Sequence, residues 1–295
     1  MDYRGYKIFE AANDVIVENV KDFNPIHIFE CGQCFRWFKR EDDSFTGIVK
    51  CKVINVKYIE NKLVINNSNI QDFIDLWFDY FDLGRDYSEI KEVLSRDETM
   101  KKAIEFGGGI RLLKQDIWET LVSFVISANN RIPMIMKVVA SISKEYGKAI
   151  VYDNYKFYSF PEVDKISESS VEELEVCKAG FRCKYISLTS QLVKEGAINL
   201  NELGSLETND ARDELMKLPG VGPKVADCVL LYSGTKYNVF PTDVWVKRVM
   251  EELYFNRQAS FKEIQQLSND KFGDLSGFAQ QYLFYYAREN KIGAK

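Results

Sequence analysis

The sequence predicts an α+β protein in which a small antiparallel β lobe precedes an all-helical body. Between residues 26 and 66, apolar and polar residues alternate, and polar clusters interrupt the alternation, which is typical of an antiparallel meander. From about Asp72 onward, apolar residues recur three or four positions apart, the spacing of amphipathic helices. Little strand signal follows, so we expect helices from there to the end.

Each element follows from a local pattern. Turn clusters at 41–44 and 59–62 separate the strand candidates, and Ile26-His27-Ile28 alternates as a strand would. The strands are predicted at 35–38, 45–49, 53–56 and 62–65. The helical spacing is carried by Phe73, Leu76, Trp77 and Tyr80, then by Ile117, Leu121, Phe124 and Val125, then by Ile135, Val138 and Val139.

The length of the chain allows two domains. With 295 residues, 46% of them hydrophobic, the chain can bury a full core. Gly107-Gly108-Gly109 is the clearest candidate for a hinge. We therefore predict an N-terminal β lobe with short helices over residues 1–112 and a helical domain over residues 113–295.

Composition limits the class of protein. A net charge of −5 argues against a protein that coats nucleic acid through bulk positive charge, although it leaves room for a local basic face. No run of about 18 apolar residues occurs, and the first residues lack the apolar core of a signal peptide. We expect a cytoplasmic monomer that does not associate with membranes.

Cysteine and histidine usage predicts no metal site. The six cysteines are scattered, and the C-x-x-C of Cys31 and Cys34 lacks a second pair at metal-ligand spacing. In a reducing compartment they are most simply free thiols. His27 is the single histidine, which excludes a multi-histidine metal site and makes a poor start for a histidine-based triad.

The most informative segment is Leu218-Pro219-Gly220-Val221-Gly222-Pro223-Lys224, with Pro241-Thr242-Asp243 further on. Pro219 and Gly220 are expected to end one helix, and Pro223 suits the first position of a second. Gly222 is expected to take backbone angles closed to other residues. The turn would expose amides at the positive end of a helix and so cradle a phosphate, although a purely structural turn is as common.

Lys224 and Asp243 each allow two interpretations. In the first helical turn, the dipole and partial desolvation favour the neutral amine of a nucleophilic Lys224; an exposed phosphate-binding lysine is the alternative. Asp243 is an ordinary helix N-cap candidate. A cap and a catalytic carboxylate are compatible roles.

These motifs resemble the helix-hairpin-helix DNA glycosylase superfamily and, more narrowly, the 8-oxoguanine DNA glycosylases. The hairpin and the Pro-Thr-Asp motif carry the resemblance, and matching segments are spread across about 250 residues of the chain. The supporting segments are Gly32–Trp37, Arg111–Asp116, Ser127–Asn130, Gly180–Tyr185 and Ala279–Phe284. The resemblance implies a β lobe like half of the TATA-binding protein, packed on a helical body.

The resemblance also implies a mechanism on double-stranded DNA that contains 8-oxoguanine. The damaged nucleotide would be flipped out of the duplex. Lys224 would attack the anomeric carbon and form a Schiff base that permits β-elimination, while Asp243 would stabilise the charge that develops on the sugar.

Roles in recognition are carried over in the same way. The carbonyl of Gly32 would accept the N7 proton of the oxidised base, Gln280 would bind its pairing edge, and Phe284 and Cys228 would form the two walls of the pocket. By themselves these residues are equally consistent with core packing, with a strand bulge at Gly32 and with an exposed helix position for Gln280.

DNA contacts and cofactors complete the implied site. Asn129 would enter the space left by the flipped base, Phe181 would wedge into the stack, and Arg182 would bind the orphaned partner base. Phosphates would be met by Gly220, Gly222 and Lys247. We expect no cofactor; a monovalent cation that faces the Gly220 and Val221 carbonyls is the one alternative.

Departures from the family pattern matter as well. Met134 stands where eukaryotic members carry an arginine, which predicts a weaker preference for cytosine opposite the lesion. Trp245 replaces a frequent phosphate-contacting histidine. No cysteine follows Cys228, which excludes the iron–sulfur loop of endonuclease III. Lys224 separates the chain from alkylpurine glycosylases, and a non-catalytic DNA-binding protein remains the alternative from another class.

Overall fold

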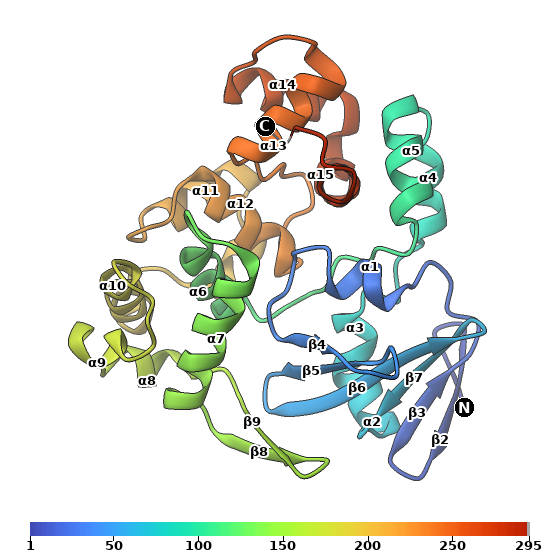
Figure 1. Ribbon diagram of the computed structural model, residues 1–295, viewed down its shortest axis with the longest axis vertical. Coiled ribbons are helices and arrows are strands. Elements are labelled where there is room, and N and C mark those ends of the chain that lie inside the picture. The colour runs from blue at the N-terminus through green and yellow to red at the C-terminus, as the bar shows by residue number, and fades with distance from the viewer. Residues whose placement is uncertain (294–295) are drawn as a thin grey trace.

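The computed structural model describes residues 1–293, in which an antiparallel sheet precedes a helical body (Figure 1). The sheet has seven strands in the order β1-β2-β3-β7-β6-β5-β4, and every neighbouring pair is antiparallel. Its strands are β1 (Asp2–Tyr3), β2 (Tyr6–Ala11), β3 (Asp14–Val17), β4 (Trp37–Lys39), β5 (Phe45–Val49), β6 (Lys52–Ile59) and β7 (Lys62–Asn66). The predicted α+β class is therefore confirmed.

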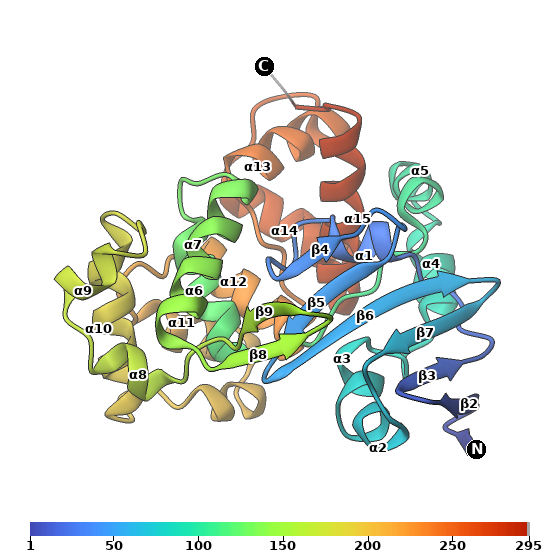
Figure 2. The same ribbon diagram turned by 60° about the horizontal axis from the view of Figure 1, so that its bottom comes forward.

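Alternation along the strands buries one face of the sheet. In the register that pairs β3, β7 and β6, Val15 faces Ile65, and Ile65 faces Val56; all three are fully buried. Helix α2 (Ile70–Asp72), the π-helical turn Phe73–Trp77 and α3 (Phe78–Tyr80) cover this face (Figure 2). The four predicted strands correspond to β4 to β7, whereas β1 to β3 were not predicted.

The predicted strand at Ile26-His27-Ile28 is wrong, because these residues lie in α1 (Pro25–Phe29). The Asn24 side chain accepts hydrogen bonds from the backbone N–H groups of Ile26 at 3.0 Å and His27 at 3.4 Å, and Pro25 occupies the first turn. An asparagine cap followed by proline starts a helix and here outweighs a short alternating pattern.

The body that follows is helical with one exception. Its helices are α4 (Tyr87–Leu94), α5 (Glu98–Gly107), α6 (Ile117–Ser127), α7 (Ile132–Tyr146), α8 (Val163–Ser167), α9 (Val171–Glu175), α10 (Arg182–Lys194), α11 (Thr208–Met216), α12 (Pro223–Tyr232), α13 (Val244–Met250), α14 (Phe261–Phe272) and α15 (Ser276–Glu289), with 3₁₀ turns at Leu200–Ser205 and Gly273–Leu275 and a π-helical turn at Glu251–Phe255. Within residues 1–293, no helix is long and apolar enough to cross a membrane.

The exception is a hairpin of β8 (Ala149–Tyr152) and β9 (Tyr155–Tyr158), so the expectation of an all-helical body needs correction. Asp153 and Asn154 both have positive φ, 50° and 61°, the geometry of the two-residue turn that matches strand twist. The hairpin lies beside β5 and β6 of the large sheet (Figure 2).

The Gly107-Gly108-Gly109 segment, predicted as a hinge, forms a closely packed turn at the end of α5. Gly109 donates its N–H to Nδ1 of His27 at 3.2 Å and accepts from the backbone N–H of Asn24 at 3.0 Å. A Cβ on Gly109 would lie 2.3 Å from that of Asn24, so close contact explains the glycine. The proposed boundary at residue 112 stays a prediction, and α4 and α5, which precede it, pack into the helical core.

Candidate active site

The helix–hairpin–helix forms from α11 and α12 as predicted. Gly220 has a φ of +79°, and a Cβ there would lie 2.8 Å from the Tyr185 ring, so both conformation and space require glycine. Gly222 instead has φ −100° and ψ −179°, an extended conformation open to any residue. The unusual backbone thus lies at Gly220, and its assignment to Gly222 is wrong. Pro223 begins α12, and Gly222 borders open space.

The predicted catalytic and base-binding residues line one cavity of about 160 Å³. They come from the loop after α1, from α12, from the start of α13 and from α15. The cavity brings together Gly32, Lys224, Cys228, Asp243, Gln280 and Phe284, with Phe35, Phe124, Ser127, Asn130, Ile132, Ile135, Tyr232, Pro241 and Val246 as further lining residues.

Lys224 is half-buried, and its amine contacts a hydroxyl group and an aromatic ring. Its Nζ lies 3.3 Å from Oγ of Ser127 and 5.2 Å from the centre of the Phe124 ring. Within residues 1–293, no carboxylate oxygen lies within 4.0 Å of this nitrogen. The amine is therefore available to a ligand in the cavity, and both interpretations of this lysine remain open. Ser127 and Phe124 were not predicted as its neighbours.

Cys228 lies one turn after Lys224 on the same face of α12 and also lines the cavity. Burial raises the pKa of its thiol to about 11, and the nearby Lys224 opposes the shift only in part. The sulfur is therefore a neutral thiol near pH 7 and presents an apolar surface to the cavity.

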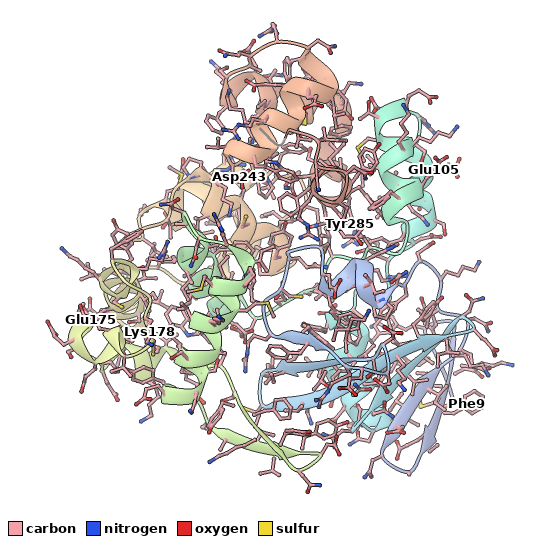
Figure 3. All side chains as sticks on the ribbon, in the orientation of Figure 1. Phe9, Glu105, Glu175, Lys178, Asp243 and Tyr285 are labelled. Atoms are coloured by element: carbon pink, nitrogen blue, oxygen red, sulfur yellow. The ribbon has the colours of Figure 1, made fainter. Side chains whose placement is uncertain are left out.

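Asp243 caps α13, as predicted. Its Oδ1 accepts hydrogen bonds from the N–H groups of Trp245 at 2.9 Å and Val246 at 2.7 Å. Figure 3 labels Asp243 where α13 begins, beside the helix that carries Lys224. Because both capping bonds use Oδ1, the cap is compatible with presenting the charge of the carboxylate to the cavity.

Gln280 and Phe284 lie one turn apart on α15. Gln280 is 3% exposed, and its Oε1 is buried without a hydrogen-bond partner among the described residues. An unpaired buried acceptor costs about 1–3 kcal/mol. The neighbouring Gln281, in contrast, donates to the Cys31 carbonyl at 3.1 Å and accepts from Tyr232 at 2.8 Å. The orphaned oxygen of Gln280 is therefore suited to a ligand that donates a hydrogen bond.

Gly32 lies close to Phe284, and both residues line the cavity. Its φ is +90°, and a Cβ would lie 3.2 Å from Cε1 of Phe284 and 3.5 Å from Cδ1 of Ile132. The position is a tight turn after α1 and not a strand bulge. On its other side, Phe284 meets Trp245 edge-on, with ring centres 5.3 Å apart. This contact was not predicted.

The residues proposed to contact DNA lie outside the cavity. Asn129 is exposed just beyond the end of α6, with a φ of +50°, and Phe181 is 60% exposed before α10. Arg182 hydrogen-bonds the carbonyls of Ala128, Asn129 and Ala179 and so holds the Asn129 turn. The DNA roles of these residues stay predictions.

Two further predictions concern a phosphate contact of Lys247 and the absence of a cofactor. Lys247, predicted to meet phosphate, forms an ion pair of 2.5 Å with Glu251 one turn later. Among the residues that the structure describes, no group of three His, Cys, Asp or Glu side chains could hold a metal ion. The cofactor prediction, including the monovalent cation at the hairpin, is tested by neither observation.

Comparison with known families covers most of the chain. Residues 15–121 match the N-terminal domain of 8-oxoguanine DNA glycosylase, and residues 122–273 match the HhH-GPD superfamily base excision DNA repair protein. The chain belongs to the 8-oxoguanine DNA glycosylase family of base excision repair proteins. The resemblance inferred from the hairpin and its companion motifs is thereby confirmed.

The similarity to solved structures of related glycosylases covers nearly the whole chain. The Clostridium acetobutylicum 8-oxoguanine glycosylase/lyase, in complex with double-stranded DNA containing cytosine opposite 8-oxoguanine, is 50% identical with a TM-score of 0.95, over 97% of this chain and 99% of that one. MBOgg1, in complex with a low-affinity DNA ligand, is 52% identical with a TM-score of 0.95, at the same coverage. A probable N-glycosylase/DNA lyase of Methanothermobacter thermautotrophicus is 29% identical over 72% of this chain and 74% of the relative.

Proposed function

We propose that this glycosylase/lyase excises 8-oxoguanine from duplex DNA through a covalent intermediate on Lys224 and then nicks the strand by β-elimination. The observation that carries the proposal is the cavity in which the Lys224 amine, without an ion-pair partner among the described residues, lies with the Asp243 carboxylate and the orphaned oxygen of Gln280. Relatives of similar fold and half-identical sequence, solved with DNA, support the choice of substrate.

The chemistry starts with attack of the Lys224 amine on the sugar. Nζ of Lys224 forms a bond to C1′ as the bond from C1′ to N9 breaks. The departing base takes the electron pair of that bond and a proton, which balances the proton that the amine loses. The carboxylate of Asp243 stabilises the positive charge that develops on the sugar in the transition state. Opening of the sugar ring then leaves a protonated Schiff base.

The lyase step uses the same intermediate. The Schiff base draws electrons from C2′, so that a proton leaves C2′ while the bond from C3′ to its phosphate oxygen breaks. The strand is cleaved with the phosphate as leaving group, and water later releases Lys224. An amine nucleophile thus supports both activities, which a water nucleophile does not.

Recognition of the base uses the walls of the cavity. 8-Oxoguanine carries a proton on N7 that guanine lacks, and Gly32 would supply the acceptor. The orphaned Oε1 of Gln280 would accept from the N–H groups on the pairing edge of the base. Phe284 would stack on one face, with the neutral thiol of Cys228 on the other.

We also propose that the enzyme has only a weak preference for cytosine opposite the lesion. Met134 is 46% exposed near the start of α7, and a thioether cannot donate hydrogen bonds to the acceptors of cytosine. Excision measured opposite each of the four bases tests this proposal. Rates as steeply dependent on cytosine as those of a strict enzyme would contradict it.

Borohydride trapping on a duplex with 8-oxoguanine tests the covalent mechanism. Wild-type protein is expected to form a stable adduct with DNA, and Lys224→Gln is expected to form none. Lys217→Gln is the matched control, because Lys217 lies in the same hairpin with a side chain 62% exposed. An adduct that survives Lys224→Gln would refute the mechanism.

A further inference from the structure

The loop that carries Gly32 is tied to the helix that carries Gln280 and Phe284 by one arginine. Arg288, in the last turn of α15, donates from Nη2 to the carbonyl oxygen of Glu30 at 2.6 Å. Its Nη1 lies 3.5 Å from where a Cβ on Gly32 would be. The guanidinium also lies 5.8 Å from the Phe284 ring centre. One side chain therefore contacts both the loop that carries Gly32 and the ring of Phe284.

Two glutamines also hold this loop, from the inside of the protein. Gln33 ties it inward to the carbonyls of Ile28 and Arg111, and neither residue belongs to α15. Gln281 holds the Cys31 carbonyl at 3.1 Å from within the buried core. Arg288 holds the preceding carbonyl from the outer side, and its side chain is 25% exposed. These two residues of α15 bracket the backbone just before Gly32.

The position of this loop matters because one hydrogen bond distinguishes the oxidised base from guanine in the proposed function. Hydrogen bonds weaken steeply beyond about 3.2 Å and below about 120°, so a loop displaced by less than 1 Å would lose the N7 contact. A flat base also requires Phe284 to remain at stacking distance from the base, whose other face contacts Cys228.

We infer that Arg288 is a positioning residue for base discrimination: it fixes the loop that carries Gly32 against the helix that carries Phe284, and thereby sets the selection of 8-oxoguanine over guanine. The inference rests on the proposed function. It assigns Arg288 no contact with the reacting atoms. An abasic site presents no base to Gly32 or Phe284, so cleavage at an abasic site is expected to be independent of Arg288.

Three measurements on Arg288→Leu test the inference. Single-turnover excision of 8-oxoguanine is expected to fall by about tenfold or more, in line with the loss of one positioned hydrogen bond. Strand cleavage of a duplex with a preformed abasic site is expected to change by less than about twofold. In the Lys224→Gln background, the ratio of affinities for 8-oxoguanine and guanine duplexes is expected to fall by up to about tenfold.

Two further variants sharpen the comparison. Arg288→Lys keeps the charge and one donor for the Glu30 carbonyl and is expected to recover part of the discrimination; it also replaces the leucine variant if that variant does not fold. Arg257→Leu removes an equal charge from an exposed ion pair with Glu263 and is expected to behave as wild type.

The possible results separate the inference from the proposed function. Equal losses of base excision and abasic-site cleavage in Arg288→Leu would overturn the inference, since they would indicate a general structural role. Unchanged excision and unchanged discrimination would overturn it as well. Failure of the wild-type protein to excise 8-oxoguanine would instead refute the proposed function, whatever the variants do.

Discussion

Nζ of Lys224 lies 3.3 Å from Oγ of Ser127, across the gap between α12 and the end of α6. The hydroxyl of Ser127 donates to the Phe124 carbonyl at 2.7 Å, so its lone pairs face the amine. With the Phe124 ring below the nitrogen, this contact restricts where the amine points. Ser127 thus aims the proposed nucleophile.

Ser127→Ala should slow both activities, because both start from the same amine. Loss of one hydrogen bond predicts a decrease of about twofold to tenfold in single-turnover excision and in abasic-site cleavage. Ser127→Thr keeps the hydroxyl and should retain most of the rate. Equal rates for wild type and Ser127→Ala would show that the contact does not orient Lys224.

Substitutions of Asp243 should separate its role as a helix cap from the role of its charge in excision. Asp243→Asn keeps an Oδ1 acceptor for Trp245 and Val246 but removes the charge, so thermal stability should remain close to wild type while excision falls by about 10²–10³. Asp243→Ala should in addition lower the free energy of unfolding by about 1 kcal/mol. Thermal melts together with single-turnover rates measure both effects. Equal destabilisation by the two substitutions would contradict the separation.

Gln280→Met should stabilise the DNA-free protein while impairing excision. The substitution preserves shape and removes a buried oxygen without a partner, which predicts a higher Tm and about tenfold or greater loss of 8-oxoguanine excision. Gln281→Met is the matched control on the same helix. It breaks bonds to Cys31 and Tyr232 and should lower the Tm. A Tm decrease in Gln280→Met would indicate that the oxygen is not orphaned.

His27 should make stability depend on pH. Burial lowers the pKa of this imidazole below its ordinary value of 6.5, and Nδ1 accepts the N–H of Gly109, so the folded protein favours the neutral ring. The contribution of His27 is then complete above about pH 6.5 and is lost as the pH falls below it towards the folded pKa.

Urea unfolding of wild type at pH 7.5 and 5.5, compared with His27→Asn, isolates this contribution, because the sequence holds one histidine. The asparagine can still accept from Gly109 but does not titrate. Wild type should lose more stability than the variant between these pH values. Identical pH dependence in both proteins would rule out His27 as the group responsible.

Local patterns were sufficient where the structure is stabilised locally. Residues near each other in the chain specify the cap at Asp243, the turn at Gly220 and the strands β4 to β7. Two short elements were missed although their signals are also local. Helix α1 depends on the Asn24 cap and Pro25, and the hairpin of β8 and β9 depends on the turn at Asp153 and Asn154. Those signals are in the sequence but are weaker than a long periodic pattern.

The sequence by itself determined the α+β class, the helix–hairpin–helix with Lys224 and, by resemblance, the family. Tertiary structure alone decided the shape of the cavity that Gly32, Lys224, Asp243 and Gln280 line. It also decided that Oε1 of Gln280 has no hydrogen-bond partner among the described residues, and that Arg288 reaches Glu30. Caps and turns are governed by backbone geometry over a few residues. Cavity walls and orphaned acceptors depend on how distant segments pack, and no local pattern specifies that packing.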